Sequence, residues 1–374
     1  MAVAAQAVRA APGILPGQAI TALRDAGAIA ARPFVPDQVQ PASLDLRLGP
    51  RAWRVRASFL PSARASIEAR LQALALHDIE LNEQGTVFEA GCVYLVELEE
   101  RLALPADLSA ATNPKSSTGR LDVFTRVIGD GVAAFDAVPA GYEGPLYLEV
   151  SPRTFPILVR RGSRLAQIRF RRGEARLDGP ALAALQRRER LVDADDADLG
   201  AGAVAVSVDL SGHHAGGLVG FRAKRHTGLI DVDKRAAYAV TDFWEPLRSA
   251  SAQGLVLDPD AFYILASKEA VHVPPDLAAE MVPFDPLVGE FRVHYAGFFD
   301  PGFGHAAAGG SGARAVLEVR SREVPFILED GQIVGRLVYE RLTERAATLY
   351  GQTLGSNYQA QGLKLSKHFK PFSG

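Results

Sequence analysis

Glu100-Arg-Leu-Ala-Leu-Pro105-Ala-Asp107-Leu108 recurs 169 residues later as Glu269-Ala-Val-His-Val-Pro274-Pro-Asp276-Leu277. Chance can produce one such match, but further blocks that keep the same offset indicate an internal duplication. Two more blocks do keep it: Gly85-Thr-Val-Phe with Gly254-Leu-Val-Leu, and Leu148-Glu149-Val150 with Leu317-Glu318-Val319. We therefore interpret the chain as two diverged copies of one module.

Each copy consists of short apolar runs that are separated by turn-forming residues. The length and punctuation of these runs predict strands of a sandwich or barrel, and they include Val93–Leu98, Leu146–Val150, Phe155–Val159 and Leu165–Phe170. Apolar residues at helical spacing or helix-favouring composition predict short helices over Pro16–Ile29, Ser62–Leu76 and Pro180–Val192. The expected fold class is mainly β with short peripheral helices.

The division between the two copies is expected after the third of these helices. An acidic stretch of small, turn-prone residues runs from Asp193 to Gly202. A chain of 374 residues is also comfortable for two domains. We predict an N-terminal module over 1–192 and a C-terminal module over 193–374.

Composition excludes several classes of protein. The formal net charge of -2 argues against binding to long nucleic acid, which favours a basic surplus. The single cysteine, Cys92, can form neither an internal disulfide nor a cysteine-rich metal site. No apolar run approaches 18 residues and the first residues lack a basic leader, so we expect a cytoplasmic protein without a membrane partner.

A polar cluster in the first copy suits phosphate groups. Lys115-Ser116-Ser117-Thr118-Gly119-Arg120 combines two cations, three hydroxyls and a glycine. Side chains and backbone N–H groups of this kind donate hydrogen bonds to phosphate oxygens, although a plain polar surface turn has similar composition. The matching stretch of the second copy, Val282–Gly289, has lost every cation and hydroxyl. Only the first copy can bind phosphate at this place.

A glycine turn in the second copy suits a sugar. It reads Ala296-Gly-Phe-Phe-Asp300-Pro-Gly-Phe303, so an acid and an aromatic lie together. Asp300 can accept a hydrogen bond from a sugar hydroxyl; the alternative is a hairpin that carries a core aromatic. The first copy, Val138–Gly144, keeps the turn but has no acid at the equivalent position.

Both copies keep a glutamate inside an apolar strand, Glu149 and Glu318. A carboxylate flanked by leucine and valine is costly to bury without partners or a raised pKa, so it is a candidate general acid/base. The alternative is a glutamate that faces solvent, because side chains alternate along a strand.

Together these pieces resemble the dCTP deaminase family, which shares its fold with trimeric dUTPases. The resemblance covers most of the chain twice and implies a tandem duplication of a dUTPase-like distorted β-barrel or jelly-roll module. It rests on the Lys115–Arg120 cluster, the Ala296 to Phe303 turn, Leu317-Glu318, and a tail with Tyr350, Asn357-Tyr358 and Gln361-Gly362. Lys115 stands where the family has arginine, and Asn357 where it has a lid lysine, for which Lys364 or Lys367 is a substitute candidate.

Family sites lie between subunits, one giving the Ser-Ser loop and its neighbour the Asp turn and the glutamate. The resemblance therefore implies one composite site, with the phosphate loop from the first copy and the other groups from the second. Glu318 would be the catalytic carboxylate and Glu149 a relic. The water would be held by Ser116, Arg120 and the Ala296 carbonyl; Asp300 would bind the 3′-hydroxyl, and Phe303 would lie near the sugar. Phosphates would be bound by Lys115, Ser117 and Gln361, and the remaining substrate contacts would come from Val316, Leu317 and Tyr350.

The implied reaction is hydrolysis of dCTP to dUTP and ammonia. Zinc deaminases use a His/Cys/Cys set that this sequence lacks, so we expect no zinc and no other protein-bound metal, with Mg²⁺ carried by the nucleotide triphosphate. We expect dCTP and dUTP as ligands and a homo-oligomer. Two alternatives stay open: a dUTP diphosphatase or bifunctional enzyme, and a non-catalytic nucleotide-binding protein.

Overall fold

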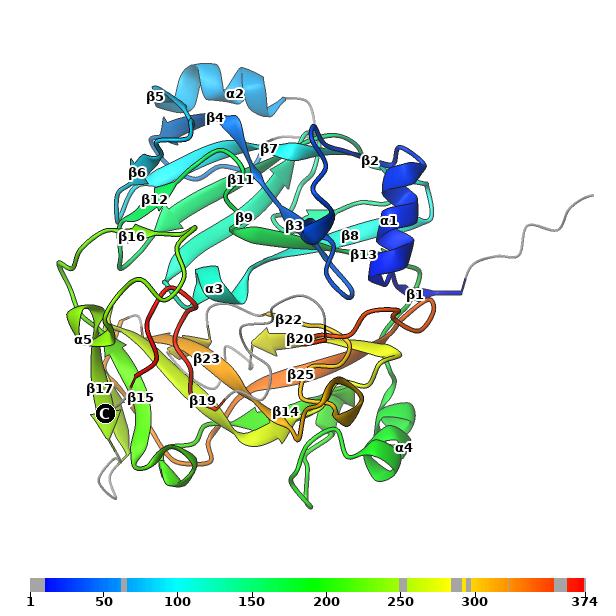
Figure 1. Cartoon of the computed structure of the whole chain (residues 1–374), viewed down its shortest axis with the longest axis vertical. Helices are drawn as coiled ribbons and strands as arrows, with labels where there is room; N and C mark the ends of the chain where they lie inside the picture. The colour runs from blue at the N-terminus through cyan, green and yellow to red at the C-terminus, as the bar shows by residue number, and fades with distance from the viewer. Residues whose placement is uncertain are drawn as a thin grey trace, which may run out of the picture.

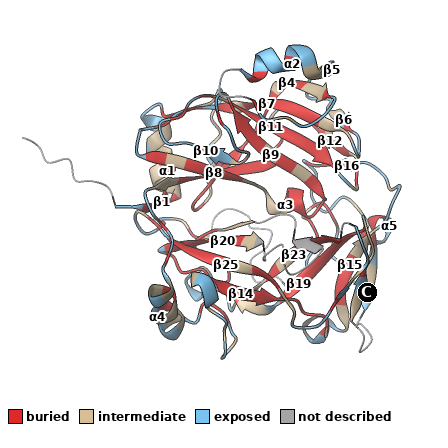
Figure 2. Cartoon of the chain, turned by 180° about the vertical axis from the view of Figure 1, so that it is seen from behind, coloured by how far each residue is buried: buried red, intermediate tan, exposed pale blue. Residues whose placement is uncertain are grey.

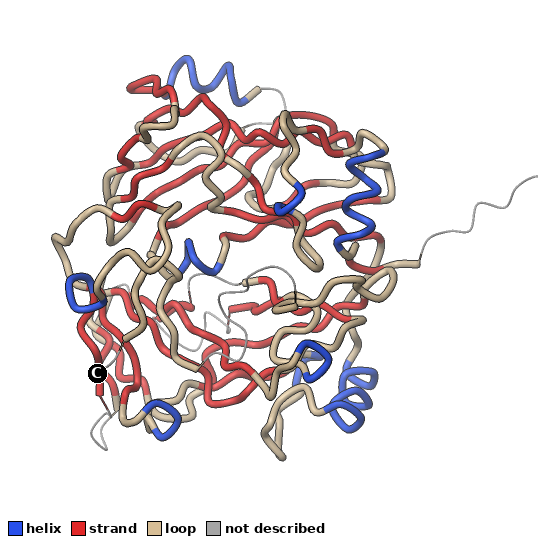
Figure 3. Tube along the Cα trace, in the orientation of Figure 1, coloured by secondary structure: helices blue, strands red, loops and turns tan. Residues whose placement is uncertain are grey.

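The computed structural model describes residues 11–61, 66–248, 254–283, 291–293, 297–321, 323–352 and 362–372. The fold is mainly β, as predicted, and two halves face each other (Figures 1 and 3). Among the described residues, no helix has the length and apolar character needed to cross a membrane.

Three sheets build the first half, and nearly all their pairings are antiparallel. The first contains β1 (Gly13–Ile14), β13 (Ala166–Arg172), β8 (Leu108–Pro114) and β10 (Ala137–Val138), with β3 (Leu44–Leu46) on β13. The second runs β5 (Ala75–Glu80), β4 (Leu48–Val55), β7 (Val93–Ala103), β11 (Glu143–Pro152), β9 (Val123–Gly129), with β2 (Ile29–Ala30) on β7. The third is β16 (Ile230–Asp231), β12 (Ile157–Val159) and β6 (Thr86–Phe88), where β16 comes from the second half and pairs in parallel.

The strands of the second half recur near the offset found in the sequence. One sheet contains β14 (Val204–Ser207), β25 (Ile333–Arg341), β20 (Leu277–Pro283) and β22 (Phe298–Phe299). Another contains β17 (Trp244–Arg248), β15 (Leu218–Ala223), β19 (Phe262–Val271), β23 (Ala313–Ser321) and β21 (Phe291–Val293). A strand pair, β18 (Leu255–Leu257) and β24 (Phe326–Leu328), completes this half. β8 and β20 begin 169 residues apart, as do β6 and β18.

Helices are short and mostly peripheral (Figure 2). They are α1 (Gly17–Asp25), α2 (Ile67–Leu74), α3 (Ser116–Gly119), α4 (Gly179–Glu189) and α5 (Val240–Phe243), with 3₁₀ turns at Pro36–Gln38, Gly200–Gly202, His213–Ala215 and Ala306–Ala308. The predicted helices were too long at their C-terminal ends. α1 ends early because Gly27 adopts a positive φ of 80° and closes the last turn. α2 ends early because Ala75 turns extended and pairs with Val55.

The largest apolar core belongs to both halves. Strand residues of the first half supply most of it, but the second half inserts buried side chains, among them Phe221, Ile230, Trp244, Ile264, Leu365 and Phe369. A second core lies within the second half, and Leu182 and Leu185 of α4 pack into it. The predicted domain boundary at residue 192 stays a prediction. The shared core explains why α3 and β23 are held face to face (Figure 1).

Candidate active site

A single helical turn carries the predicted phosphate cluster. Lys115 is still extended after β8, the turn α3 follows, and Asp122 reverses the chain with a φ of 56°. Ser116 opens the turn and is partly exposed, while Ser117 and Arg120 are buried. The cluster is therefore not the solvated surface loop that its composition also allowed. It projects toward the second half (Figure 1).

Glu318 lies opposite this turn because of the alternation along β23. Leu317 and Val319 point into the core of the second half, so Val316 and Glu318 point the other way, toward the first half. The Nε atom of Arg120 lies 3.8 Å from Oε1 of Glu318. The structure thus brings together the two groups that the sequence assigned to different copies.

Burial sets the protonation of Glu318. Its side chain is only about 6% exposed, and this burial raises the pKa of Glu318 to about 8, with the Arg120 guanidinium limiting the rise. A carboxyl group with a pKa near neutral can both give and accept a proton under physiological conditions. The solvent-facing alternative for this glutamate is therefore wrong.

The predicted phosphate cation has a carboxylate partner. Lys115 forms an ion pair with Asp45, which is buried, and Arg164 lies 3.7 Å from the other oxygen of Asp45. Nearby, burial and the charges of Lys115 and Arg235 lower the pKa of Lys367 to about 8. Cations thus gather around α3, and an anionic ligand would relieve their mutual repulsion.

Asp300 is buried in the Gly turn and faces the first half. Nη2 of Arg169, from β13, lies 3.4 Å from its Oδ1, and the same guanidinium donates to the Ala279 carbonyl at 3.0 Å. Burial raises the pKa of Asp300, while Arg169 and Lys115 oppose the rise. Asp45, the partner of Lys115, lies opposite Gln167 on β13, two residues from Arg169, so the predicted sugar and phosphate groups share one region.

The other predicted contacts lie partly in the core and partly outside the described residues. Phe303 is buried edge-on against Phe299, with ring centres 5.0 Å apart, and 5.6 Å from the ring of Tyr350. Leu317 is also a core residue, so its side chain supports the site from behind. Several predicted site residues and compared segments fall outside the described residues: Ala296, Gln361, Phe284–Gly289 and Asn357–Tyr358.

Glu149 has a different environment from Glu318. It lies on β11 directly opposite Arg126 of β9, and the Arg126 guanidinium donates two hydrogen bonds to Oε1, at 2.6 and 3.0 Å. Arg126 also donates to the Ser58 hydroxyl at 2.6 Å. The carboxylate is thus committed to an ion pair within its own half.

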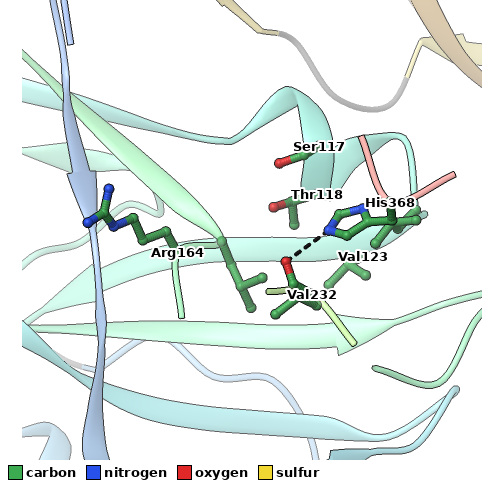
Figure 4. A pocket seen from close by; sticks show the side chains of 8 residues that line it. Ser117, Thr118, Val123, Arg164, Val232 and His368 are labelled. Carbon is green, nitrogen blue, oxygen red and sulfur yellow. Dashed lines mark hydrogen bonds between the residues drawn. The ribbon is translucent and has the colours of Figure 1, made fainter. Parts of the chain in front are cut away.

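The end of the chain adds contacts that the sequence did not reveal. The Arg120 guanidinium donates to the Lys364 carbonyl at 2.9 Å, and the Ser366 hydroxyl donates to the Ser117 carbonyl at 2.7 Å. Buried His368 lies 2.9 Å from the Val232 carbonyl through Nε2, in a narrow pocket beside α3 (Figure 4). Burial lowers the pKa of His368 to about 4, so the neutral ring donates through Nε2, and its Nδ1, 2.8 Å from the Ser366 hydroxyl, shares as an acceptor the proton that Ser366 also donates to the Ser117 carbonyl. The C-terminal segment therefore supports the phosphate turn from one side.

Two family models match the two parts of the chain. A family model described as "2'-deoxycytidine 5'-triphosphate deaminase (DCD), C-terminal domain" matches residues 178–369, and the corresponding N-terminal domain model matches residues 11–174. A dCTP deaminase of Haloarcula marismortui is 31% identical over 145 residues, which is 38% of this chain and 71% of the relative. A "dCTP deaminase, dUMP-forming" of Aquifex aeolicus is 30% identical over 168 residues, 45% of this chain and 83% of the relative.

One solved structure is similar to nearly the whole chain. The crystal structure of 2'-deoxycytidine 5'-triphosphate deaminase from Agrobacterium tumefaciens superposes with a TM-score of 0.87 at 59% sequence identity. The alignment covers 92% of this chain and 99% of that chain.

Proposed function

The chain belongs to the 2'-deoxycytidine 5'-triphosphate deaminase family, and on that premise we propose that it hydrolyses dCTP to dUTP and ammonia with Glu318 as general acid and base. The observation that carries the proposal is the position of Glu318, buried and 3.8 Å from an arginine of the other half. A non-catalytic nucleotide-binding protein would have little reason to keep a buried carboxyl group in this position.

The protonation state of Glu318 suggests the order of the proton transfers. In the reaction, the oxygen of water bonds to C4 of cytosine, the C4–N bond breaks, and the two protons of water end on ring N3 and on the leaving amine. With a pKa of about 8, Glu318 carries a proton at neutral pH and can give it to N3, which makes C4 more electrophilic. The resulting carboxylate then accepts a proton from water, whose oxygen bonds to C4, and gives that proton to the amine. When the C4–N bond breaks and ammonia leaves, the proton left on the C4 oxygen returns to Glu318, which restores its protonated form.

Arg120 suits the second half of this cycle. Once Glu318 has given up its proton, the guanidinium of Arg120 stabilises the buried carboxylate. Its position is fixed because another of its nitrogens donates to the Lys364 carbonyl. Ser116 opens the same turn, and we assign it with Arg120 to the attacking water. We therefore assign Arg120 both to tuning the pKa of Glu318 and to orienting the attacking water.

The triphosphate would take the place of a carboxylate. We assign Lys115 and Ser117 to phosphates. Because Lys115 is paired with Asp45, we expect the nucleotide to compete with Asp45 for the ammonium group. Mg²⁺ would arrive with the triphosphate as part of the substrate. Asp300, whose carboxylate is held by Arg169, is assigned to the 3′-hydroxyl of the sugar.

One chain would then contain one composite site. The ion pair between Glu149 and Arg126 supports the reading of Glu149 as a relic, because this carboxylate is held inside its own half. The homo-oligomer stays a prediction, as do the contacts of Ala296, Phe303 and Gln361 with substrate.

The test is product analysis after incubation of the protein with dCTP and Mg²⁺. Equal amounts of dUTP and ammonia are the expected products. Ammonia with dUMP in place of dUTP would identify a bifunctional enzyme; formation of dUMP is named for the Aquifex aeolicus relative. Absence of ammonia from the dCTP reaction would overturn the proposal.

A further inference from the structure

A second ion pair joins the halves next to Arg120 and Glu318. Arg320 follows Glu318 by two residues on β23, so both side chains point toward the first half. Asp122 follows Arg120 by two residues after α3. Arg320 donates through Nη2 to Asp122, and both residues are buried. The two pairs are adjacent, and their charges are reversed. The strand β23 supplies the acid Glu318 to Arg120 and the base Arg320 to Asp122.

The second pair has further hydrogen-bond partners around it. The Arg320 guanidinium also donates to the Asp260 carbonyl and lies 3.2 Å from the Thr154 hydroxyl. That hydroxyl donates to the same Asp122 carboxylate at 2.6 Å. A planar guanidinium with several partners holds a fixed orientation, which a lysine at the same position could not reproduce. The backbone at Asp122 is therefore fastened to β23.

We propose that the ion pair between Arg320 and Asp122 is a positioning device that sets the separation between Arg120 and Glu318. The Asp122 backbone is two residues from Arg120, so a fastened Asp122 limits how far the Arg120 side chain can approach or leave β23. Arg320 and Asp122 act through Arg120 and are positioning residues. This inference rests on the proposed function only where turnover is the readout.

The surroundings of Glu318 define what a change in that separation would do. Among the described residues, Arg120 is the charged group that acts on Glu318, and the charged residues next to this pair are Asp122 after α3, Arg320 on the strand of Glu318, and Lys364, whose carbonyl accepts from Arg120. The strand β19 contributes an apolar residue, Ile264, opposite Glu318. Because Arg120 is the group that limits the rise in the pKa of Glu318, a wider separation should raise that pKa further.

The discriminating variant is Arg320→Lys, which keeps the charge and removes the planar fork. If the separation widens by about 1 Å, Coulomb's law at an effective dielectric of about 20 gives a rise of roughly half to one pH unit in the Glu318 midpoint. The midpoint is measured without substrate, as the pH dependence of the difference in unfolding free energy between each protein and its Glu318→Gln derivative. Turnover should fall about tenfold in kcat, with KM for dCTP unchanged.

Two further variants keep the test decisive. Asp122→Asn retains the shape and tolerates the positive φ, and it should lower kcat by a similar factor. In an Arg120→Lys background, Arg320→Lys should cause no additional loss of kcat. Arg160→Lys is the matched control, because Arg160 also crosses between the halves and binds Asp231 with two hydrogen bonds of 2.8 and 2.9 Å.

An unchanged midpoint in Arg320→Lys would overturn the proposal, as would an equal shift in Arg160→Lys, which would indicate general loosening. A loss of kcat that persists in the Arg120→Lys background would overturn it as well. If the wild type releases no ammonia from dCTP while the midpoints shift as expected, the proposed function fails and the positioning role stands.

Discussion

Replacing Glu318 by glutamine is expected to make the protein slower and, at neutral to alkaline pH, more stable. Glutamine has nearly the same shape but carries no charge, so it removes the proton transfer and the burden of a buried ionised group together. The two effects have the same origin, because the burial that raises the pKa of Glu318 also destabilises its carboxylate form.

The size of the stability effect follows from the pKa. The pKa rises from 4.5 to about 8 on folding, which corresponds to at most about 5 kcal/mol. Between these two values the unfolded chain has released a proton that the folded protein keeps, so the unfolding free energy contributed by Glu318 falls as pH rises. The penalty is absent below pH 4.5 and complete above pH 8. The advantage of Glu318→Gln should therefore grow through this window and level off above it.

The assay combines urea denaturation at several pH values with dCTP turnover. The rate should fall by about 10²- to 10⁴-fold, the usual contribution of a positioned acid and base. Glu149→Gln is the matched control, since Glu149 occupies the equivalent strand position but binds Arg126. It should keep most of the activity and lose stability, because Arg126 loses its carboxylate partner. Equal loss of activity in both variants, or a Glu318→Gln protein whose stability advantage does not grow with pH, would refute the reasoning.

Three further outcomes follow from the same site. Lys115→Met should raise KM for dCTP by about tenfold or more, as expected for loss of a charged hydrogen bond, and leave binding of unphosphorylated deoxycytidine unchanged by calorimetry. Chelation of Mg²⁺ with EDTA should raise KM for dCTP, and added Mg²⁺ should restore it where Zn²⁺ does not. Ser366→Ala should lower the unfolding free energy by about 1 kcal/mol in urea and reduce kcat, because the Ser117 carbonyl loses a donor.

Each of these has an outcome that contradicts it. Weaker binding of deoxycytidine by Lys115→Met would place the lysine elsewhere than at the phosphates. Full activity in EDTA would show that Mg²⁺ is not part of the substrate. Recovery with Zn²⁺ alone would indicate a reaction that depends on a protein-bound metal. Wild-type stability in Ser366→Ala would mean that the C-terminal segment does not support α3.

The sequence predicted the features that depend on local pattern or on comparison of the two copies. Strand positions followed from apolar runs and turn residues. A strand that is buried on both faces appears as a continuous apolar run, and a strand that is buried on one face appears as an alternation of apolar and polar residues. The meeting of Arg120 with Glu318 was implied by the resemblance to a family whose sites lie between subunits, and the complementary losses in the two copies agree with that division. The resemblance thus implied a contact between residues nearly 200 positions apart.

Contacts that depend on register or on chain termini could not be predicted in this way. The pairing of Asp45 with Lys115 depends on how β3 lies beside β13. The pairing of Glu149 with Arg126 depends on which residues face each other across β11 and β9. His368 follows the last motif and belongs to no repeat, so only the folded chain reveals that it is buried beside α3.

The core that both halves share affects how the nucleotide can enter and leave the site. A site built between separate subunits can open when the subunits move apart. Here such a movement would expose Trp244, Ile264 and Phe369 to water, at a cost of roughly 1.5 to 3 kcal/mol for each large side chain. Separating the halves is therefore costly, and we expect dCTP to enter and leave while the shared core stays packed.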